Sequence, residues 1–238
     1  GNKKPRLFRN RSEKSLLNRL GFNNKGVDFL VNKLKKNKCD VVLGISIGKN
    51  FNTPNHKAYL DYEVCMRKVY EYSDDIAINI SSPNTEGLRE LSDRTYLDSL
   101  LDNLKKLQGQ LSIEHGYKPL FLKISPDESN ENLTYICKSI LEHCIDGIIC
   151  TNTTINHKDS RGKGGLSGKP LSEISTLKLK AVKEIVGSNV PIIASGGVMS
   201  QVDYQEKILS GASLVQVYTG LIFEGPQLIE NILNTKSI

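Results

Sequence analysis

The spacing of hydrophobic residues predicts that strands and helices alternate along the whole chain. Short apolar runs predict strands at residues 41–47, 76–80, 120–124, 146–152, 190–197 and 213–220. Helical spacing predicts helices at residues 14–20, 24–36, 57–72, 129–143, 173–186 and 200–210, one after Pro226, and one capped by Ser92 that carries Leu97, Leu100, Leu101, Leu104 and Leu107. Six strand–helix units in this order predict a parallel sheet with right-handed crossovers.

Two of these segments carry further expectations. The nearly continuous apolar run at 41–47 is typical of a parallel strand covered on both faces. The segment at 153–169 is polar and glycine-rich, which predicts a long loop.

The stretch Ile76–Gly87 is the first candidate for a functional site. Five mostly branched apolar residues run directly into Ser81, Ser82, Pro83 and Asn84. Proline has no backbone donor, so it ends strand pairing at the carboxyl edge, where parallel α/β folds place reactive groups. Taken alone, the composition of the segment favours a strand followed by an ordinary Ser or Asx turn.

The loops after the last two strands bear on how the sheet closes. Gly196-Gly197 and Tyr218-Thr219-Gly220 stand where TIM-type barrels bind a phosphate after strands seven and eight. No G-x-G-x-x-G turn follows any predicted strand, so a dinucleotide site in an open doubly wound sheet is unsupported. We therefore predict an α/β fold of the TIM (β/α)8 barrel type, with six of the eight βα units present.

Polar side chains at the predicted strand ends form a second pattern. The group is rich in amides and hydroxyls, contains one lysine, and lacks carboxylates and histidines; its members are Asn18, Asn79, Ser82, Asn84, Lys123, Thr151, Asn152 and Thr153. Amides both donate and accept hydrogen bonds, which suits a planar imide heterocycle or a flavin ring. Lys123 lies inside an apolar strand, so we expect its ammonium to have a specific anionic or electron-rich partner.

Composition excludes a disordered chain and a collagen-like fold. With 38% hydrophobic and 24% charged residues, the 238-residue chain is typical of a globular domain. The net charge of +6 includes a cluster at Lys3, Lys4, Arg6, Arg9 and Arg11. No nucleic-acid-binding motif accompanies that cluster, so we expect no nucleic-acid partner. An anionic membrane surface and an anionic substrate are the alternative partners of this cluster.

Cysteine and histidine spacing argues against disulfide and metal sites. The five cysteines, Cys39, Cys65, Cys137, Cys144 and Cys150, form no C-x-x-C pair and are expected to be reduced core residues. The four histidines have no metal-ligand spacing, so we expect no metal. No apolar run approaches the ~18 residues of a membrane span, and no signal peptide is visible.

Several motifs, in order and similarly spaced, resemble those of class 2 dihydroorotate dehydrogenases. They are residues 18–23 (NRLGFN), 44–50 (GISIGKN), 79–85 (NISSPNT), 151–154 (TNTT) and 164–171 (GGLSGKPL), together with Gly196-Gly197 and Tyr218-Thr219. The resemblance covers essentially the whole chain.

This resemblance implies an activity. The family is an FMN-containing (β/α)8 barrel that oxidises dihydroorotate to orotate in pyrimidine synthesis and passes the electrons to a respiratory quinone. It implies that Ser82 is the catalytic base, and class 1 members carry cysteine there. It further implies a monomer bound peripherally to the inner membrane, on the cytoplasmic side as in bacteria.

The same resemblance assigns the remaining site residues. It places on the substrate side Asn18, Arg19, Leu20, Gly21, Phe22, Asn79, Asn84, Asn152 and Thr153. It places on the FMN side Ser46, Asn79, Lys123, Thr151, Ser167, Gly168, Gly196, Gly197, Tyr218 and Thr219.

The chain also departs from the family pattern. Ser46 stands where asparagine is usual, and the loop between Thr154 and Gly164 is several residues shorter. The family's first two strands and its membrane-docking helices have no counterpart, so we expect residues 1–238 to form the C-terminal three-quarters of one FMN-binding domain. Two alternatives stay open: another FMN barrel that uses a nicotinamide or fumarate acceptor, and a truncated chain without turnover.

Overall fold

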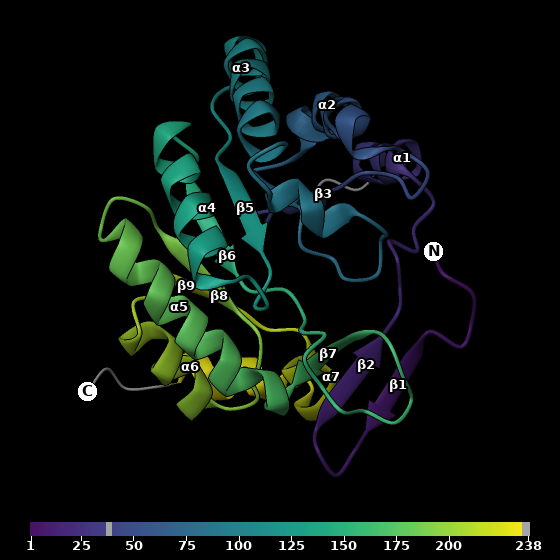
Figure 1. Ribbon diagram of the computed structural model, residues 1–238, viewed down its shortest axis with the longest axis vertical. Coiled ribbons are helices and arrows are strands. Elements are labelled where there is room, and N and C mark those ends of the chain that lie inside the picture. Colours follow the sequence, from purple (N-terminus) through teal and green to yellow (C-terminus); the bar gives the residue numbers. More distant parts are fainter. Residues whose placement is uncertain (37–39, 235–238) are drawn as a thin grey trace.

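A curled sheet of six parallel strands organises the protein (Figure 1). The computed structural model describes residues 1–36 and 40–234. The strand order is β3 (Gly44–Ile47), β4 (Asp75–Asn79), β5 (Leu120–Ile124), β6 (Gly147–Cys150), β8 (Ile192–Ser195) and β9 (Leu214–Gln216). Every neighbouring pair is parallel. The prediction of six βα units from a TIM-type barrel is therefore confirmed.

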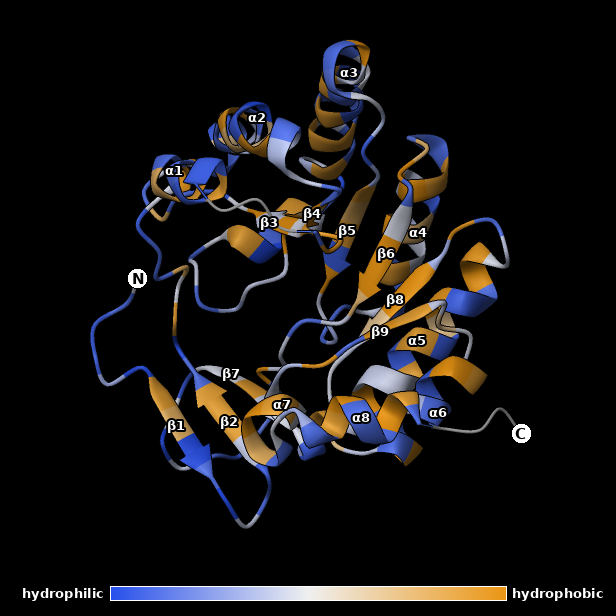
Figure 2. Cartoon of the chain, turned by 180° about the vertical axis from the view of Figure 1, so that it is seen from behind, coloured by the Kyte–Doolittle hydropathy of each residue, from blue (hydrophilic) through white to orange (hydrophobic). Residues whose placement is uncertain are grey.

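The helices lie outside the curled sheet, as both views of the ribbon show (Figures 1 and 2). They are α1 (Val27–Lys36), α2 (Ala58–Val69), α3 (Leu97–His115), α4 (Asn130–Glu142), α5 (Ser172–Val186), α6 (Gln201–Leu209), α7 (Thr219–Glu224) and α8 (Gln227–Leu233). The apolar stripes of α1 to α6 pack on one face of the sheet and form the main hydrophobic core, in which Ile78, Leu122 and Ile148 are fully buried. Leu228 and Ile232 of α8 form a separate small cluster with Val198.

The opposite, inner face of the sheet has a different character. A small apolar cluster of Ala77, Ile149 and Ile193 lies there, with Phe121 packed against it. Strand register places Asn79 beside Lys123, and Lys123 beside Ile149. Because side chains at one level of a parallel sheet point to the same face, polar and apolar groups share this inner surface.

The two edge strands of the sheet, β3 and β9, each pair with only one neighbour among the described strands. In β3 the residues alternate between exposed and buried, and Leu214 in β9 is 62% exposed. The prediction that residues 41–47 form a strand covered on both faces is wrong. Val41 and Val42 precede the strand and are exposed, and no layer of the described residues covers the inner face of β3.

A second, antiparallel sheet was not predicted. It consists of β1 (Leu7–Asn10), β2 (Ser15–Asn18) and β7 (Gly165–Gly168), in the order β1-β2-β7. The helix predicted at 14–20 is therefore wrong, and the loop predicted at 153–169 ends in a strand. β2 and β7 are short and pair through backbone groups that are about 150 residues apart in sequence. Their side chains therefore show almost no periodic pattern from which the strands could be predicted.

Two local predictions also fail. Ser92 does not cap α3, because that helix begins at Leu97, and the Ser92 hydroxyl instead contacts the Arg89 carbonyl at 2.7 Å. Cys144 is exposed, although Cys65, Cys137, Cys144 and Cys150 are all free as expected. Cys39 lies outside the described residues. None of the helices in the described ranges is long and apolar enough to span a bilayer.

The buried Leu17 anchors the antiparallel sheet, so we expect Leu17→Ala to be costly. Its side chain is 0% exposed, whereas Leu7 in the same sheet is 53% exposed. Truncation should lower the free energy of unfolding by about 2–5 kcal/mol for Leu17, and by less than about 0.5 kcal/mol for Leu7→Ala. Urea unfolding followed by circular dichroism measures both, and equal effects would contradict this packing.

Candidate active site

The loop after β4 carries the first group of polar side chains. Asn79 ends the strand, and its Oδ1 atom accepts hydrogen bonds from the backbone N–H and the hydroxyl of Ser81, both at 3.2 Å. Asn152, from the end of β6, donates through Nδ2 to Asn79 Oδ1 at 3.3 Å and to Ser81 Oγ at 3.1 Å. Two strand ends 73 residues apart in sequence are therefore joined through their side chains.

Asn79 is also held from the outer side of the sheet. The fully buried Tyr62 on α2 donates its hydroxyl to the Asn79 carbonyl at 2.9 Å. Burial raises the pKa of this phenol, so Tyr62 remains a protonated donor over the physiological range.

The antiparallel sheet contributes a second group that faces the first. Asn84 Nδ2 donates to Asn18 Oδ1 at 2.8 Å, and Asn18 Nδ2 donates to the Gly165 carbonyl at 3.0 Å. These bonds connect the serine loop to β2 and β7. Ser82 itself is buried, and its hydroxyl oxygen accepts the backbone N–H of Asn84 at 3.3 Å.

Glycines allow these segments to approach one another closely. A Cβ atom on Gly165 would overlap the Thr153 side chain and lie 3.0 Å from Pro83 Cγ. A Cβ atom on Gly48 would lie 3.1 Å from the ring of Phe22. The loop of residues 18–23 thus lies against the strand ends that carry the asparagines.

Lys123 lies on the inner face, beside Asn79 in the strand register. Burial of its ammonium lowers its pKa from the ordinary value. It has no hydrogen-bond or ion-pair partner among the residues that the structure describes. The predicted specific partner is therefore absent from the described protein, and the ammonium is available to a ligand on this face.

The glycine-containing segments after β8 (Gly196-Gly197) and after β9 (Gly220) meet at the β9 side of the sheet, and we call this region the glycine corner. A side chain on Gly197, whose φ is +75°, would overlap the backbone of Ser172 at the start of α5. A side chain on Gly220 would overlap the Val198 carbonyl, so the two predicted phosphate loops are neighbours. Within residues 1–36 and 40–234, the N–H groups of Gly196 and Gly197 find no acceptor. Free N–H groups in a glycine-lined corner fit the phosphate of a nucleotide cofactor such as FMN.

The antiparallel sheet reaches this corner too. Thr219 Oγ1 donates to Ser167 Oγ at 2.9 Å, and the Ser167 hydroxyl contacts the Leu16 carbonyl at 3.3 Å. A Cβ atom on Gly168 would overlap the Lys14 carbonyl and lie 3.0 Å from Thr219 Cγ2. Four of the residues assigned to FMN, Ser167, Gly168, Gly197 and Thr219, therefore border the same corner.

Other predicted site residues contribute differently. The Arg19 guanidinium donates to the carbonyls of Arg161 and Lys163 and so holds the loop before β7. Tyr218 directs an exposed side chain to the surface, and Ser46 is exposed on the edge strand β3. Leu20, Gly21 and Thr151 take part mainly through the backbone: Leu20 accepts the Asn2 N–H, Gly21 turns at φ +61°, and Thr151 donates its N–H to Ser195.

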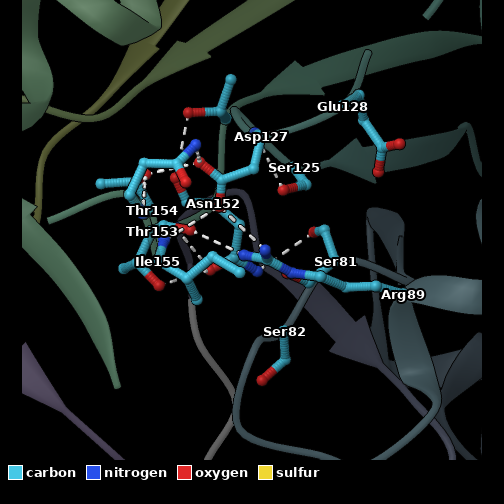
Figure 3. Close-up of polar contacts among 12 residues, drawn as sticks. Ser81, Ser82, Arg89, Ser125, Asp127, Glu128, Asn152, Thr153, Thr154 and Ile155 are labelled. Atoms are coloured by element: carbon cyan, nitrogen blue, oxygen red, sulfur yellow. Dashed lines mark hydrogen bonds and ion pairs between the residues drawn. The ribbon is translucent and has the colours of Figure 1, made fainter. Parts of the chain in front are cut away.

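Sequence reasoning missed an ion pair beside the asparagines. Arg89 and the largely buried Asp127 pair at 2.8 Å, and Figure 3 shows them beside Ser81, Asn152 and Thr154. The predicted absence of a carboxylate is therefore wrong for the immediate surroundings of the site. No local pattern identifies this pair, because its members are 38 residues apart.

It also missed Lys207, which is 0% exposed. Its ammonium donates to the Ser172 carbonyl, Ser175 Oγ and Thr176 Oγ1, at 3.0, 2.7 and 2.6 Å. Ser175 Oγ in turn contacts the Gly196 carbonyl at 2.9 Å, so the lysine supports the glycine corner from beneath. Burial lowers the pKa of Lys207 to about 8, against the opposing influence of Glu206, Cys150 and Asp203.

Comparison with known proteins places this geometry in context. The family model for dihydroorotate dehydrogenase matches residues 1–236. A dihydroorotate dehydrogenase (quinone) from Vibrio parahaemolyticus is 50% identical over 98% of this chain and 71% of the relative. One from Aliivibrio fischeri is 49% identical over 98% of this chain and 72% of the relative.

Solved structures agree with the sequence relatives. The crystal structure of DHODH from Eimeria tenella in complex with ferulenol superposes with a TM-score of 0.90 at 35% identity. The match covers 98% of this chain and 69% of that structure. The chain thus spans about 70% of the length of the relatives that it matches.

Lys207 makes stability depend on pH in a defined direction. Its pKa is about 8 in the folded state and 10.5 ordinarily, so between these values the unfolded chain binds the extra proton. The free energy of unfolding should therefore rise with pH across this window, by up to about 3 kcal/mol relative to Lys207→Met. Urea unfolding of the flavin-free proteins at pH 7, 8.5 and 9.5 measures the difference. The exposed Lys180→Met variant serves as the control, and parallel pH curves for all three proteins would contradict the assignment.

Proposed function

Because the chain belongs to the dihydroorotate dehydrogenase family, we propose that it oxidises dihydroorotate to orotate in pyrimidine biosynthesis, with FMN as cofactor and a quinone as final acceptor. One observation carries this proposal. Asn79 and Asn152 are hydrogen-bonded to Ser81, which precedes the buried Ser82, and Asn84 joins the same loop to Asn18 of the antiparallel sheet.

The amide groups are suited to hold a pyrimidine substrate. Asn18, Asn79, Asn84 and Asn152 already form two hydrogen-bonded pairs, which fix the direction of each amide. A dihydropyrimidine presents alternating N–H and C=O groups, and amides match that pattern without adding charge. The arrangement therefore favours orientation of a ring over hydrolysis.

Ser82 is proposed as the base that takes a proton from the ring methylene of dihydroorotate. The hydrogen on the neighbouring ring carbon would leave as hydride, for which bound FMN would supply the acceptor, and a carbon–carbon double bond would form in the ring. A neutral serine must lose its own hydroxyl proton as it accepts another, so a relay to solvent completes the transfer. Among the described residues, no carboxylate or histidine is hydrogen-bonded to Ser82.

The residues of the glycine corner would hold FMN. Gly196, Gly197 and Thr219 are proposed to bind its phosphate, and Ser167 and Gly168 to border it. Lys123 is proposed to lie beside the ring system, where its partly buried ammonium would favour a negatively charged reduced ring.

The quinone acceptor implies contact with a membrane, because respiratory quinones dissolve in lipid. We propose peripheral attachment, at the cytoplasmic side of the inner membrane as for a bacterial enzyme, and a monomeric state. An acceptor screen with a quinone analogue, a nicotinamide nucleotide and fumarate tests the choice of acceptor. Faster turnover with either soluble acceptor would exclude the quinone assignment.

We further propose that two additional parallel strands complete the barrel between β3 and β9. The outer edges of both edge strands are unpaired within the part of the chain that the structure describes, and Leu214 on β9 is largely exposed. Open strand edges favour association with other chains, so a closing segment would remove this liability.

Ser82→Ala provides the direct test of the reaction. Removal of the base should lower the rate of dihydroorotate oxidation at least ~10²-fold while FMN stays bound. Orotate formation and flavin absorbance measure the two properties separately, with the exposed Ser12→Ala as a control that keeps full activity. Unchanged turnover in Ser82→Ala would exclude the serine as the base.

Gly197→Ala tests the proposed phosphate corner. The new Cβ atom would overlap Ser172 at a backbone conformation of φ +75°, at a cost of about 1–3 kcal/mol. We expect the dissociation constant of FMN to rise at least about tenfold, measured by titrating flavin-free protein and following flavin fluorescence. Gly109→Ala, on α3 with open space around it, should leave the constant unchanged.

A further inference from the structure

Arg89 lies in a short 3-10 helix, η3 (Leu88–Ser92), and uses its guanidinium to contact three different loops. Nε donates to the Ser81 carbonyl at 3.2 Å, and Nη2 donates to the Thr153 carbonyl at 3.0 Å. Nη1 donates to Asp127 Oδ2 at 2.8 Å. These acceptors follow β4, β6 and β5 respectively, so one side chain links the carboxyl ends of three neighbouring strands.

Asp127 is itself anchored rather than free. Its side chain is 8% exposed, and its carboxylate accepts the Thr154 hydroxyl at 2.5 Å and the Ile155 N–H at 2.9 Å. Asn156 Nδ2 donates to the same carboxylate at 3.2 Å. The pair is therefore neutral overall and satisfied by protein groups, which makes it unsuitable as a substrate-binding charge.

The two carbonyl groups that accept hydrogen bonds from Arg89 belong to residues that directly adjoin predicted site residues. Ser81 immediately precedes Ser82, and Thr153 immediately follows Asn152, which lies beside Ser81 (Figure 3). Asn152 also contacts Asn79. A shift of the guanidinium would therefore move the serine loop relative to the amides on the β6 side. A planar guanidinium directs its N–H groups along fixed vectors, whereas an ammonium does not.

We propose that Arg89, fixed by Asp127, is a positioning residue that sets Ser82 against the amides that orient the substrate. The proposal rests on the proposed dihydroorotate oxidation. It concerns the geometry of the reacting groups, and substrate affinity depends on it only weakly. A misplacement of about 1 Å at a reacting centre can cost a factor of about 10² in rate.

The test compares Arg89→Lys and Asp127→Asn with the wild-type holoenzyme. Flavin reduction by dihydroorotate in a single turnover reports the reacting geometry, and orotate-induced change of the flavin spectrum reports binding. For Arg89→Lys we expect the reduction rate to fall about 10²-fold while the orotate dissociation constant changes less than about threefold. Asp127→Asn keeps Arg89 but removes its charged partner, and a smaller fall in the same direction is expected.

Arg67→Lys is the matched control, because Arg67 forms a two-bond ion pair with Glu63 on the exposed face of α2. It should leave rate and binding unchanged. Flavin content and melting temperature of every variant establish that only folded holoenzyme is compared. If Arg89→Lys yields no folded holoenzyme, Asp127→Asn tests the proposal by the same comparison of flavin reduction rate with orotate affinity.

Two results would overturn the proposal: flavin reduction within about threefold of wild type in both folded variants, or equal losses in rate and orotate affinity. Addition of methylguanidine to Arg89→Ala gives a further readout, and recovery of the reduction rate supports positioning by the guanidinium. Failure of the proposed function is distinguishable from these outcomes, because wild-type flavin would then not be reduced by dihydroorotate at all.

Discussion

Parallel pairing of the six central strands is the constraint on which the site depends. Since all six run in one direction, their carboxyl ends meet at a single rim, and Asn79, Ser81 and Asn152 come into contact although the outer two are 73 residues apart. The register also sets Lys123 directly beside Asn79. The helices outside the sheet bury the apolar residues of its convex face, which frees the inner face for polar groups.

The antiparallel sheet completes the rim from the other side. Its contacts with the loops that follow the central strands include Asn84 with Asn18, Thr219 with Ser167, an antiparallel bridge between Thr154 and Leu166, and a close approach at Gly165. The candidate site is thus divided between the rim of the central sheet and a second sheet that is joined to it by hydrogen bonds and close backbone contacts. Glycine is required at this close approach because any side chain would separate the two sheets.

Local pattern was sufficient to predict the central sheet, because strands such as Leu120–Ile124 are compact apolar runs between amphipathic helices. It failed for β2 and β7, whose pairing is made by backbone groups about 150 residues apart. The predicted asparagines and Ser82 were found from their place at strand ends together with the family resemblance. Arg89 and Asp127 lack such a signal, since their partners are fixed only by the folded sheet. Lys207 lacks one as well, because its burial and its partners on α5 are set only by the packing of the two helices.

The bonds made by Arg89 have an evolutionary consequence. Two of its three acceptors are the backbone carbonyls of Ser81 and Thr153, and every amino acid has such a carbonyl. Substitution of Ser81 or Thr153 would therefore keep the hydrogen-bond acceptors of Arg89. The reactive residue on the serine loop can therefore change in evolution without a change in Arg89, which holds that loop. A lineage can exchange one proton-accepting side chain for another while the surrounding scaffold stays constant, and an engineer who wishes to change the chemistry of this enzyme has the same freedom.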